Sequence, residues 1–104
     1  IQHPLAESWA ELEAANLMAF AAAQKYDQGE HCGAEANAAK YLAGEAAFKA
    51  CSNAIQTHGG MGYAKEFHVE RYFREMLIHR IAPVSPQMIL NYLAERVLGL
   101  PRSY

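Results

Sequence analysis

The sequence has few of the features that mark secreted or membrane proteins. Its 104 residues include only two cysteines, Cys32 and Cys51, which form no CxxC or zinc-like spacing. Two cysteines are too few to hold together a small secreted domain, so we expect a reducing, cytoplasmic location. No apolar run reaches the roughly 18–20 residues that a membrane span needs, and no membrane span is therefore expected.

An excess of charge of one sign is also absent. Nine Lys and Arg residues stand against 11 Asp and Glu residues, for a formal net charge of -2. Proteins that bind nucleic acid usually carry a basic patch or stripe, so nucleic acid is not an expected partner. The content of 52% hydrophobic and 19% charged residues excludes a disordered chain.

The length allows one domain of ordinary size, spanning residues 1–104. The chain begins at Ile1, without a methionine and inside an apolar pattern. A domain this small buries only about 60–70% of the surface of its unfolded chain. We therefore expect residues 1–104 to be part of a longer protein.

What the sequence does have is alanine and helical spacing. Seventeen of its 20 alanines lie between Ala6 and Ala54. Alanine favours helix and lets neighbouring backbones approach, which predicts that the first two helices pack as an antiparallel hairpin. No stretch alternates as a strand does, so the predicted fold is all-α, an up-and-down helical bundle. Its four helices are expected at about residues 5–28, 33–57, 65–81 and 86–98.

Single residues refine this prediction. Gly29 is placed to end the first helix in a left-handed conformation. Gly44, inside the second helix, indicates the close approach of another helix. Ser85 followed by Pro86 is a typical helix start, with the serine as the N-cap. Trp9 and the tyrosines at helical spacing are predicted to lie in the core.

The most concentrated motif runs from Gln56 to Tyr63 and reads QTHGGMGY. Paired glycines let a backbone touch a ligand or adopt a positive φ, and the Gln56 amide can donate and accept hydrogen bonds. The motif is not a phosphate loop, because its glycines follow a helix C-terminus, whose dipole repels anions. On spacing alone, a plain helix-ending turn is the favoured interpretation, and a ligand site is the alternative.

A second motif carries Arg71 and Arg74 on one helix face. The two arginines suit a carboxylate or phosphate, but a solvated or interhelical ion-pair network is the favoured interpretation. No histidine spacing suggests a metal site, and no nucleophilic triad is recognisable. The histidines are His3, His31, His58, His68 and His79.

Two segments together resemble the C-terminal helical domain of acyl-CoA dehydrogenases. Residues 56–63 match the family pattern Q-x-x-G-G-x-G-[YF], and residues 69–75 (VERYFRE) match V-E-[RK]-x-x-R-[DE]. The opening residues 1–6 (IQHPLA) are similar to the family's entry into a helix. These matches occur in the right order and cover nearly the whole chain.

The resemblance implies that residues 1–104 form the C-terminal bundle of a longer flavoenzyme, without the first helix of that bundle. Members of the family bind FAD and usually assemble as homo-oligomers. They oxidise acyl-CoA to 2-enoyl-CoA by α-proton abstraction with β-hydride transfer to the flavin, and pass the electrons to an electron-transferring flavoprotein. The 104-residue chain alone is expected to be inactive and to bind no FAD tightly.

The resemblance also assigns residues. The family's Q-x-x-G-G segment contacts the adenine-side half of an FAD bound mostly by a neighbouring subunit, and two further positions approach the flavin. At the position of the family's catalytic glutamate stands Pro83, which cannot accept a proton. Some members carry the base instead on the first helix of the bundle, and if this chain follows them, the base lies upstream of Ile1. The implied FAD-contacting residues are Gln56, Thr57, His58, Gly59, Gly60, Ser85 and Gln87.

Pro83 keeps a second interpretation open. A diverged dehydrogenase-like protein, or a non-catalytic helical interaction module, would also lack the glutamate. In either case a bundle without one helix exposes an apolar stripe, which predicts that the chain associates with itself as a symmetric dimer.

Overall fold

The computed structural model describes residues 1–103, and every regular element among them is helical. The all-α prediction is therefore confirmed. Two long helices are followed by short 3-10 turns and a shorter, broken helical part. The elements are α1 (Gln2–Asp27), α2 (Gly33–His58), η1 (Gly59–Tyr63), η2 (Lys65–Phe67), α3 (Val69–Ile81), α4 (Pro86–Tyr92) and the π-helical turn η3 (Leu93–Val97).

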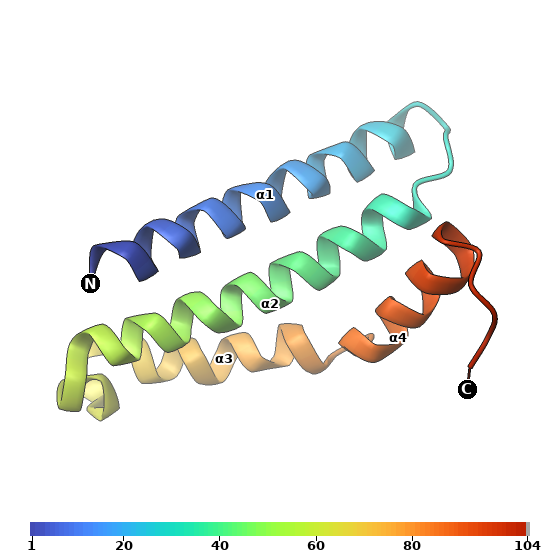
Figure 1. Cartoon of the computed structure of the whole chain (residues 1–104). Helices are drawn as coiled ribbons and strands as arrows, with labels where there is room; N and C mark the ends of the chain where they lie inside the picture. The colour runs from blue at the N-terminus through green and yellow to red at the C-terminus, as the bar shows by residue number, and fades with distance from the viewer. Residues whose placement is uncertain (104) are drawn as a thin grey trace.

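The helices form an open layer. Helix α2 lies between α1 and α3, and α4 continues from α3 along the first turns of α2 (Figure 1). Helices α1 and α2 form the predicted antiparallel hairpin. The radius of gyration is 16.1 Å, whereas a compact domain of this length has about 13 Å. The chain is thus wider and thinner than a closed bundle.

Small side chains make the contact between α1 and α2. Helix α1 turns Ser8, Ala15 and Ala22 towards α2, and these three residues are its buried ones. On α2 the buried alanines are Ala39 and Ala46. Because alanine faces alanine, the two backbones approach closely but bury little apolar area.

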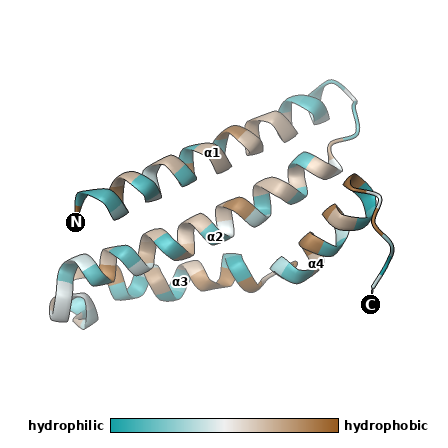
Figure 2. Cartoon of the chain, viewed as in Figure 1, coloured by the Kyte–Doolittle hydropathy of each residue, from teal (hydrophilic) through white to brown (hydrophobic). Residues whose placement is uncertain are grey.

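The prediction that Trp9 lies in the core is wrong. Its side chain is 67% exposed, because it stands one residue after Ser8 and so points about 100° away from the face that packs on α2. Tyr26 and Tyr72, which lie within predicted helices, are exposed as well, against the same prediction. The hydropathy colouring in Figure 2 shows hydrophilic and hydrophobic stretches following one another along α1.

Ion pairs join the helices across this layer. Lys49 of α2 lies 2.7 Å from Glu7 and 2.9 Å from Glu11 of α1. At the other end of the hairpin, Lys25 lies 2.6 Å from Glu35. The Lys25 ammonium donates a hydrogen bond to the Glu35 carboxylate, and this bond lowers the pKa of Glu35 and raises the pKa of Lys25. These contacts fix the alignment of two helices whose alanine faces are uniform.

Helix α3 contacts α2 through an ion pair and a cation–π interaction, both made by Arg80. The Arg80 Nε lies 2.8 Å from Glu45, and its guanidinium stacks over the Phe48 ring at 5.0 Å. A Cβ placed on Gly44 would lie 3.7 Å from the Cα of Arg80. The predicted close approach of another helix at Gly44 is therefore confirmed, with α3 as that helix.

Helix ends follow the predicted local signals in most places. Gly29 has φ +72°, and the Ser85 Oγ accepts a hydrogen bond from the Met88 amide at 3.3 Å. The third helix begins later than predicted, at Val69, because His68 takes a left-handed conformation with φ 63° after the short η2 turn. The fourth is regular only to Tyr92 and then widens into η3.

Candidate functional site

The candidate cofactor-contacting segment, Gln56–Gly60, forms the last turn of α2 and the first residues of η1. All five residues are exposed at one end of the layer. The amide of Gln56 makes no hydrogen bond within the part of the chain that the structure describes. The segment therefore presents an unpaired amide and open backbone to whatever lies beyond this end.

The other two side chains of the segment are turned back on the helix. The Thr57 hydroxyl donates to the Asn53 carbonyl at 2.7 Å, and Nδ1 of His58 lies 2.8 Å from the Ala54 carbonyl. The His58 ring also lies 5.7 Å from that of Phe67. These contacts order the last helical turn, and they leave the Gln56 amide and Nε2 of His58 without a hydrogen bond in the described chain.

Each glycine of the motif is required for a different structural reason. Gly59 has φ +60°, which ends α2 in a conformation that suits glycine, and Gly60 has open space where a Cβ would stand. Gly62 is buried, and a Cβ there would collide with the backbone of Ile55, 3.0 Å from its carbonyl carbon. Gly62 thus lets the chain fold back tightly against α2, whereas Gly59 and Gly60 leave an open surface.

The second predicted group lies elsewhere. Ser85 and Gln87 lie at the start of α4, beyond the C-terminal end of α3, whereas Gly60 lies before the N-terminal end of α3. Helix α3 alone is roughly 20 Å long. Ser85 uses its hydroxyl to cap α4, and Gln87 is exposed. The structure therefore does not bring the two groups together. Either one extended ligand spans both groups, or each group contacts a different ligand.

Pro83 lies in the extended link between α3 and α4, and it is exposed. The link itself, residues 82–85, contains no acid, and Glu66 and Glu75 are exposed on η2 and α3. No carboxylate therefore takes the place of the family's catalytic glutamate in this link.

Arg71 and Arg74 are held by glutamates of their own helix. Arg74 lies 2.7 Å from Glu70, and Arg71 lies 3.9 Å from Glu75, both at i,i+4 spacing. The ion-pair interpretation of this motif is confirmed. The two guanidinium groups are exposed, so these pairs stabilise the fold only modestly.

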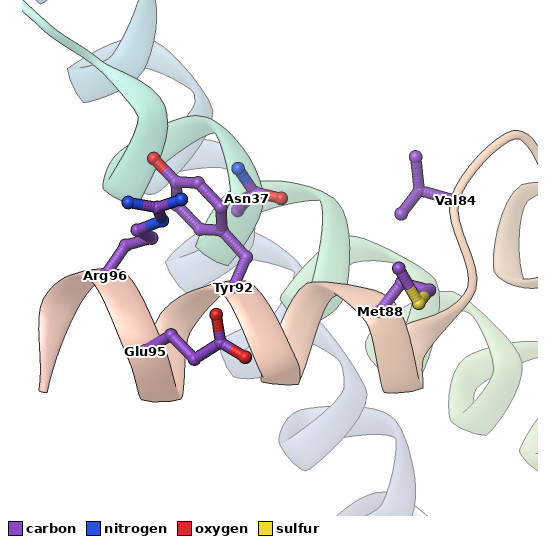
Figure 3. Close-up of a pocket in the computed structure, with 6 residues that line it drawn as sticks. All are labelled: Asn37, Val84, Met88, Tyr92, Glu95 and Arg96. Carbon is purple, nitrogen blue, oxygen red and sulfur yellow. The ribbon is translucent and has the colours of Figure 1, made fainter. Parts of the chain in front are cut away.

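One pocket was not predicted. It has a volume of about 280 Å³ between α4, η3 and the start of α2. Figure 3 shows its polar groups gathered around Tyr92, with Val84 and Met88 at the apolar end. The Glu95 Oε1 is buried there and accepts no hydrogen bond. The sequence carried no signal for it, because Glu95 is one of 11 acids scattered along the chain.

The arrangement at the end of α2 fits part of a dinucleotide but not its phosphates. A helix C-terminus carries partial negative charge, which disfavours a phosphate there. An amide at Gln56 and the uncovered backbone at Gly59 and Gly60 suit hydrogen bonds to a neutral heterocycle and close packing against a flat ring. The residues therefore fit the adenine side of FAD.

Comparison with known families decides what this fold belongs to. The family model described as acyl-CoA dehydrogenase, C-terminal domain, matches residues 1–98. The chain belongs to this family. It is 46% identical over 106 aligned residues to acyl-CoA dehydrogenase FadE12 of Mycobacterium tuberculosis, covering 100% of this chain and 27% of that protein.

Other members of the family show the range of relatives. The chain is 42% identical to a 3-(aryl)acrylate reductase of Clostridium sporogenes, over 94% of this chain and 26% of that protein. It is 36% identical to the rat mitochondrial short/branched chain specific acyl-CoA dehydrogenase, over 93% of this chain and 22% of that protein. The chain thus spans about a quarter of the length of these relatives.

Two structural findings complete the description. No helix in residues 1–103 is long and apolar enough to cross a membrane. Both cysteines are free thiols, and burial raises the pKa of Cys51.

Proposed function

We propose that residues 1–104 form the FAD-contacting and oligomerisation domain of an acyl-CoA dehydrogenase. The observation that carries this proposal is the open segment Gln56–Gly60 at the end of α2, in a chain that belongs to the acyl-CoA dehydrogenase C-terminal family. Gln56, Gly59 and Gly60 would contact the adenine side of an FAD bound mostly by a neighbouring subunit, with Thr57 and His58 ordering the turn.

The start of α4 would contribute at the flavin end. The exposed Gln87 amide is available as a donor, and Ser85 sits beside it as the cap of α4. FAD, when bound, supplies the hydride acceptor for oxidation of an acyl-CoA to a 2-enoyl-CoA. Because Pro83 cannot accept a proton, we place the catalytic base on another part of the longer protein.

The partners and location follow from the same proposal. The substrate would be an acyl-CoA, and the electron acceptor an electron-transferring flavoprotein. A relative that is 39% identical over 81% of this chain is named as the CarC subunit of a caffeyl-CoA reductase-Etf complex, which supports such a partner. The two free cysteines support a reducing, cytoplasmic location.

A chimera tests the proposal. In FadE12 of Mycobacterium tuberculosis, the matching C-terminal part would be replaced by residues 1–104. We expect the chimera to purify with bound flavin and to reduce an artificial electron acceptor when an acyl-CoA is added. A well-folded chimera that holds no flavin would contradict the proposal.

A single residue sharpens this test. In the chimera, Gln56→Ala removes the free amide and should weaken flavin binding about fivefold, since one hydrogen bond contributes about 1 kcal/mol. Gln24→Ala, an exposed glutamine on α1, is the matched control and should leave flavin binding unchanged. Equal flavin affinity of the two variants would remove Gln56 from the site.

Pro83 supports a second candidate function, a diverged member that binds its partners but does not oxidise an acyl-CoA. In that case the longer protein would retain flavin and its assembly state, and would show no turnover with any acyl-CoA. Because the base would come from FadE12 in the chimera, the longer protein itself must be assayed: turnover of an acyl-CoA by it would exclude the second candidate.

A further inference from the structure

The C-terminal end of α3 is attached to one face of α2, which runs beside α3 in Figure 1. Lys40, Gly44 and Phe48 lie on this face, because they are spaced four residues apart. The Lys40 ammonium donates a hydrogen bond to the His79 carbonyl. One turn further along α2, the absent side chain of Gly44 leaves room for the backbone of Arg80, and the Arg80 guanidinium stacks on Phe48. Three successive turns of α2 thus hold the end of α3.

The hydrogen bond from Lys40 fills a place that the backbone of α3 leaves empty. In a helix that continued, the amide of residue 83 would donate to the His79 carbonyl. Residue 83 is Pro83, which has no N–H. Lys40 supplies a donor from another helix, and its positive charge suits the partial negative charge of a helix C-terminus.

A second attachment lies beside the first. The Arg80 Nε lies 2.8 Å from Oε1 of Glu45, and an outer nitrogen of the same guanidinium lies 3.4 Å from Oε2. We call the Lys40–His79 and Glu45–Arg80 contacts together the α3 clamp. Both contacts join residues of this chain, so the clamp does not depend on any part of the longer protein.

The α3 clamp stands next to the link of residues 82–85. This link ends at Ser85, whose Oγ accepts from the Met88 amide at 3.3 Å and whose carbonyl accepts from the Ile89 amide at 3.1 Å. Among the described residues of α4, Ile89 alone is buried. The far end of the link is therefore anchored by one cap and one buried side chain, and the direction in which the link leaves α3 is set by the clamp.

We propose that Lys40 is a positioning residue for the ligand site at the start of α4. By holding the end of α3, Lys40 fixes the path of the link and so the place where Ser85 and Gln87 are presented. Its own ammonium is bound to the His79 carbonyl, so it acts through the link and not by touching a ligand. This inference rests on the proposed function, which assigns Ser85 and Gln87 to the flavin side of FAD.

The alternative is that Lys40 only stabilises the fold. A residue of that kind would affect all helices alike, whereas a positioning residue affects the link, α4 and the flavin environment. The space around Lys40 provides a conservative variant that separates the two. A cavity of about 320 Å³ lies between Lys40, His79 and the small residues Ala43, Gly44 and Ala47. The longer side chain of Lys40→Arg fits there and keeps both the donor and the charge.

Hydrogen exchange of the 104-residue chain, without flavin, tests the clamp. Lys40→Met removes the ammonium and keeps the apolar stem, so the amides of residues 84–90 should exchange about fivefold faster while those of α1 are unchanged. Lys40→Arg should restore the original rate. Lys65→Met, an exposed lysine on η2, is the matched control. Unchanged exchange of residues 84–90 in Lys40→Met, or equally faster exchange in α1, would overturn the proposal.

The flavin-loaded FadE12 chimera tests the positioning role. Lys40→Met should shift the flavin absorbance bands and lower acyl-CoA turnover severalfold, while the amount of bound flavin stays the same, because Gln56 holds the other side of the cofactor. Gln87→Ala should shift the bands as well. If Lys40 acts through Gln87, the double variant differs little from Gln87→Ala alone. Additive shifts, or unchanged bands in Lys40→Met, would overturn the proposal.

The two experiments keep this inference apart from the proposed function. A chimera that holds no flavin would contradict the proposed function, and hydrogen exchange would still decide whether Lys40 holds the link. Bound flavin with unchanged absorbance bands in Lys40→Met would overturn the positioning role and leave the proposed function standing.

Discussion

At the scale of the residue, the glycines after α2 carry two different constraints. Gly62 is buried against Ile55, whereas Gly60 faces open space. The sequence motif predicts a turn or a ligand contact for the whole run of glycines. It does not show which glycine serves the turn and which one leaves room for a ligand. Only the fold-back of η1 onto α2 decides which glycine packs and which one leaves room.

Gly62→Ala should therefore lower the free energy of unfolding by about 1–3 kcal/mol, because its Cβ meets backbone that cannot move aside easily. Gly60→Ala is the matched control and should change stability by less than about 0.5 kcal/mol. Urea denaturation followed by circular dichroism measures both. Equal losses at the two positions would mean that the turn does not close as described.

The residue scale also shows where local signals are sufficient. Gly29 and Ser85 were predictable because a left-handed helix end and an N-cap depend on the residues next to them. Trp9 was predicted wrongly because helical spacing defines a face but not the neighbour that covers it. His68 was missed, since a left-handed residue other than glycine has no reliable sequence signal.

At the scale of the element, α1 and α2 are joined by alanine packing and by ion pairs near the ends of the hairpin. The Lys25–Glu35 pair lies where the two helices meet at the connecting turn. The hydrogen bond from Lys25 lowers the pKa of Glu35 below its ordinary value of 4.5. The ionised carboxylate is therefore favoured in the folded chain.

The sign of the pH dependence follows from this shift. The pair contributes its stability above the unfolded pKa of Glu35, and that contribution is lost as the pH falls through the lower, folded pKa. Urea midpoints between pH 7 and pH 3 should fall less steeply in Lys25→Gln than in the unchanged chain. Lys65→Gln, an exposed lysine on η2, should keep the original slope. Identical slopes for Lys25→Gln and the unchanged chain would rule out this role for the pair.

The order and approximate bounds of the helices could be predicted because each is bracketed by glycine, proline or a cap. The packing could not be predicted in the same way. Ala15, Ala22, Ala39 and Ala46 form the contact, yet alanines occur on all faces of both helices. Which of them are buried depends on the ion pairs and on the tertiary arrangement, neither of which the spacing records.

At the scale of the whole molecule, both the open layer of helices and the family membership indicate that the chain packs against further parts of a larger assembly. The thin core buries few large side chains, and it leaves the outer face of α1, the end of α2 and Gln87 at the start of α4 exposed. In the function that we propose, the end of α2 meets the adenine side of FAD and the start of α4 meets its flavin side. The candidate residues were predictable from the family motif, whereas their separation across α3 needed the structure.

The central claim is that the end of α2 contacts a dinucleotide held mostly by another subunit. A crystal structure of the flavin-loaded FadE12 chimera tests it most directly. We predict that Gln56, Gly59 and Gly60 lie against the adenine half of an FAD whose remaining contacts come from a neighbouring subunit. Clear flavin density with Gln56–Gly60 turned away from it in every protomer would contradict the account.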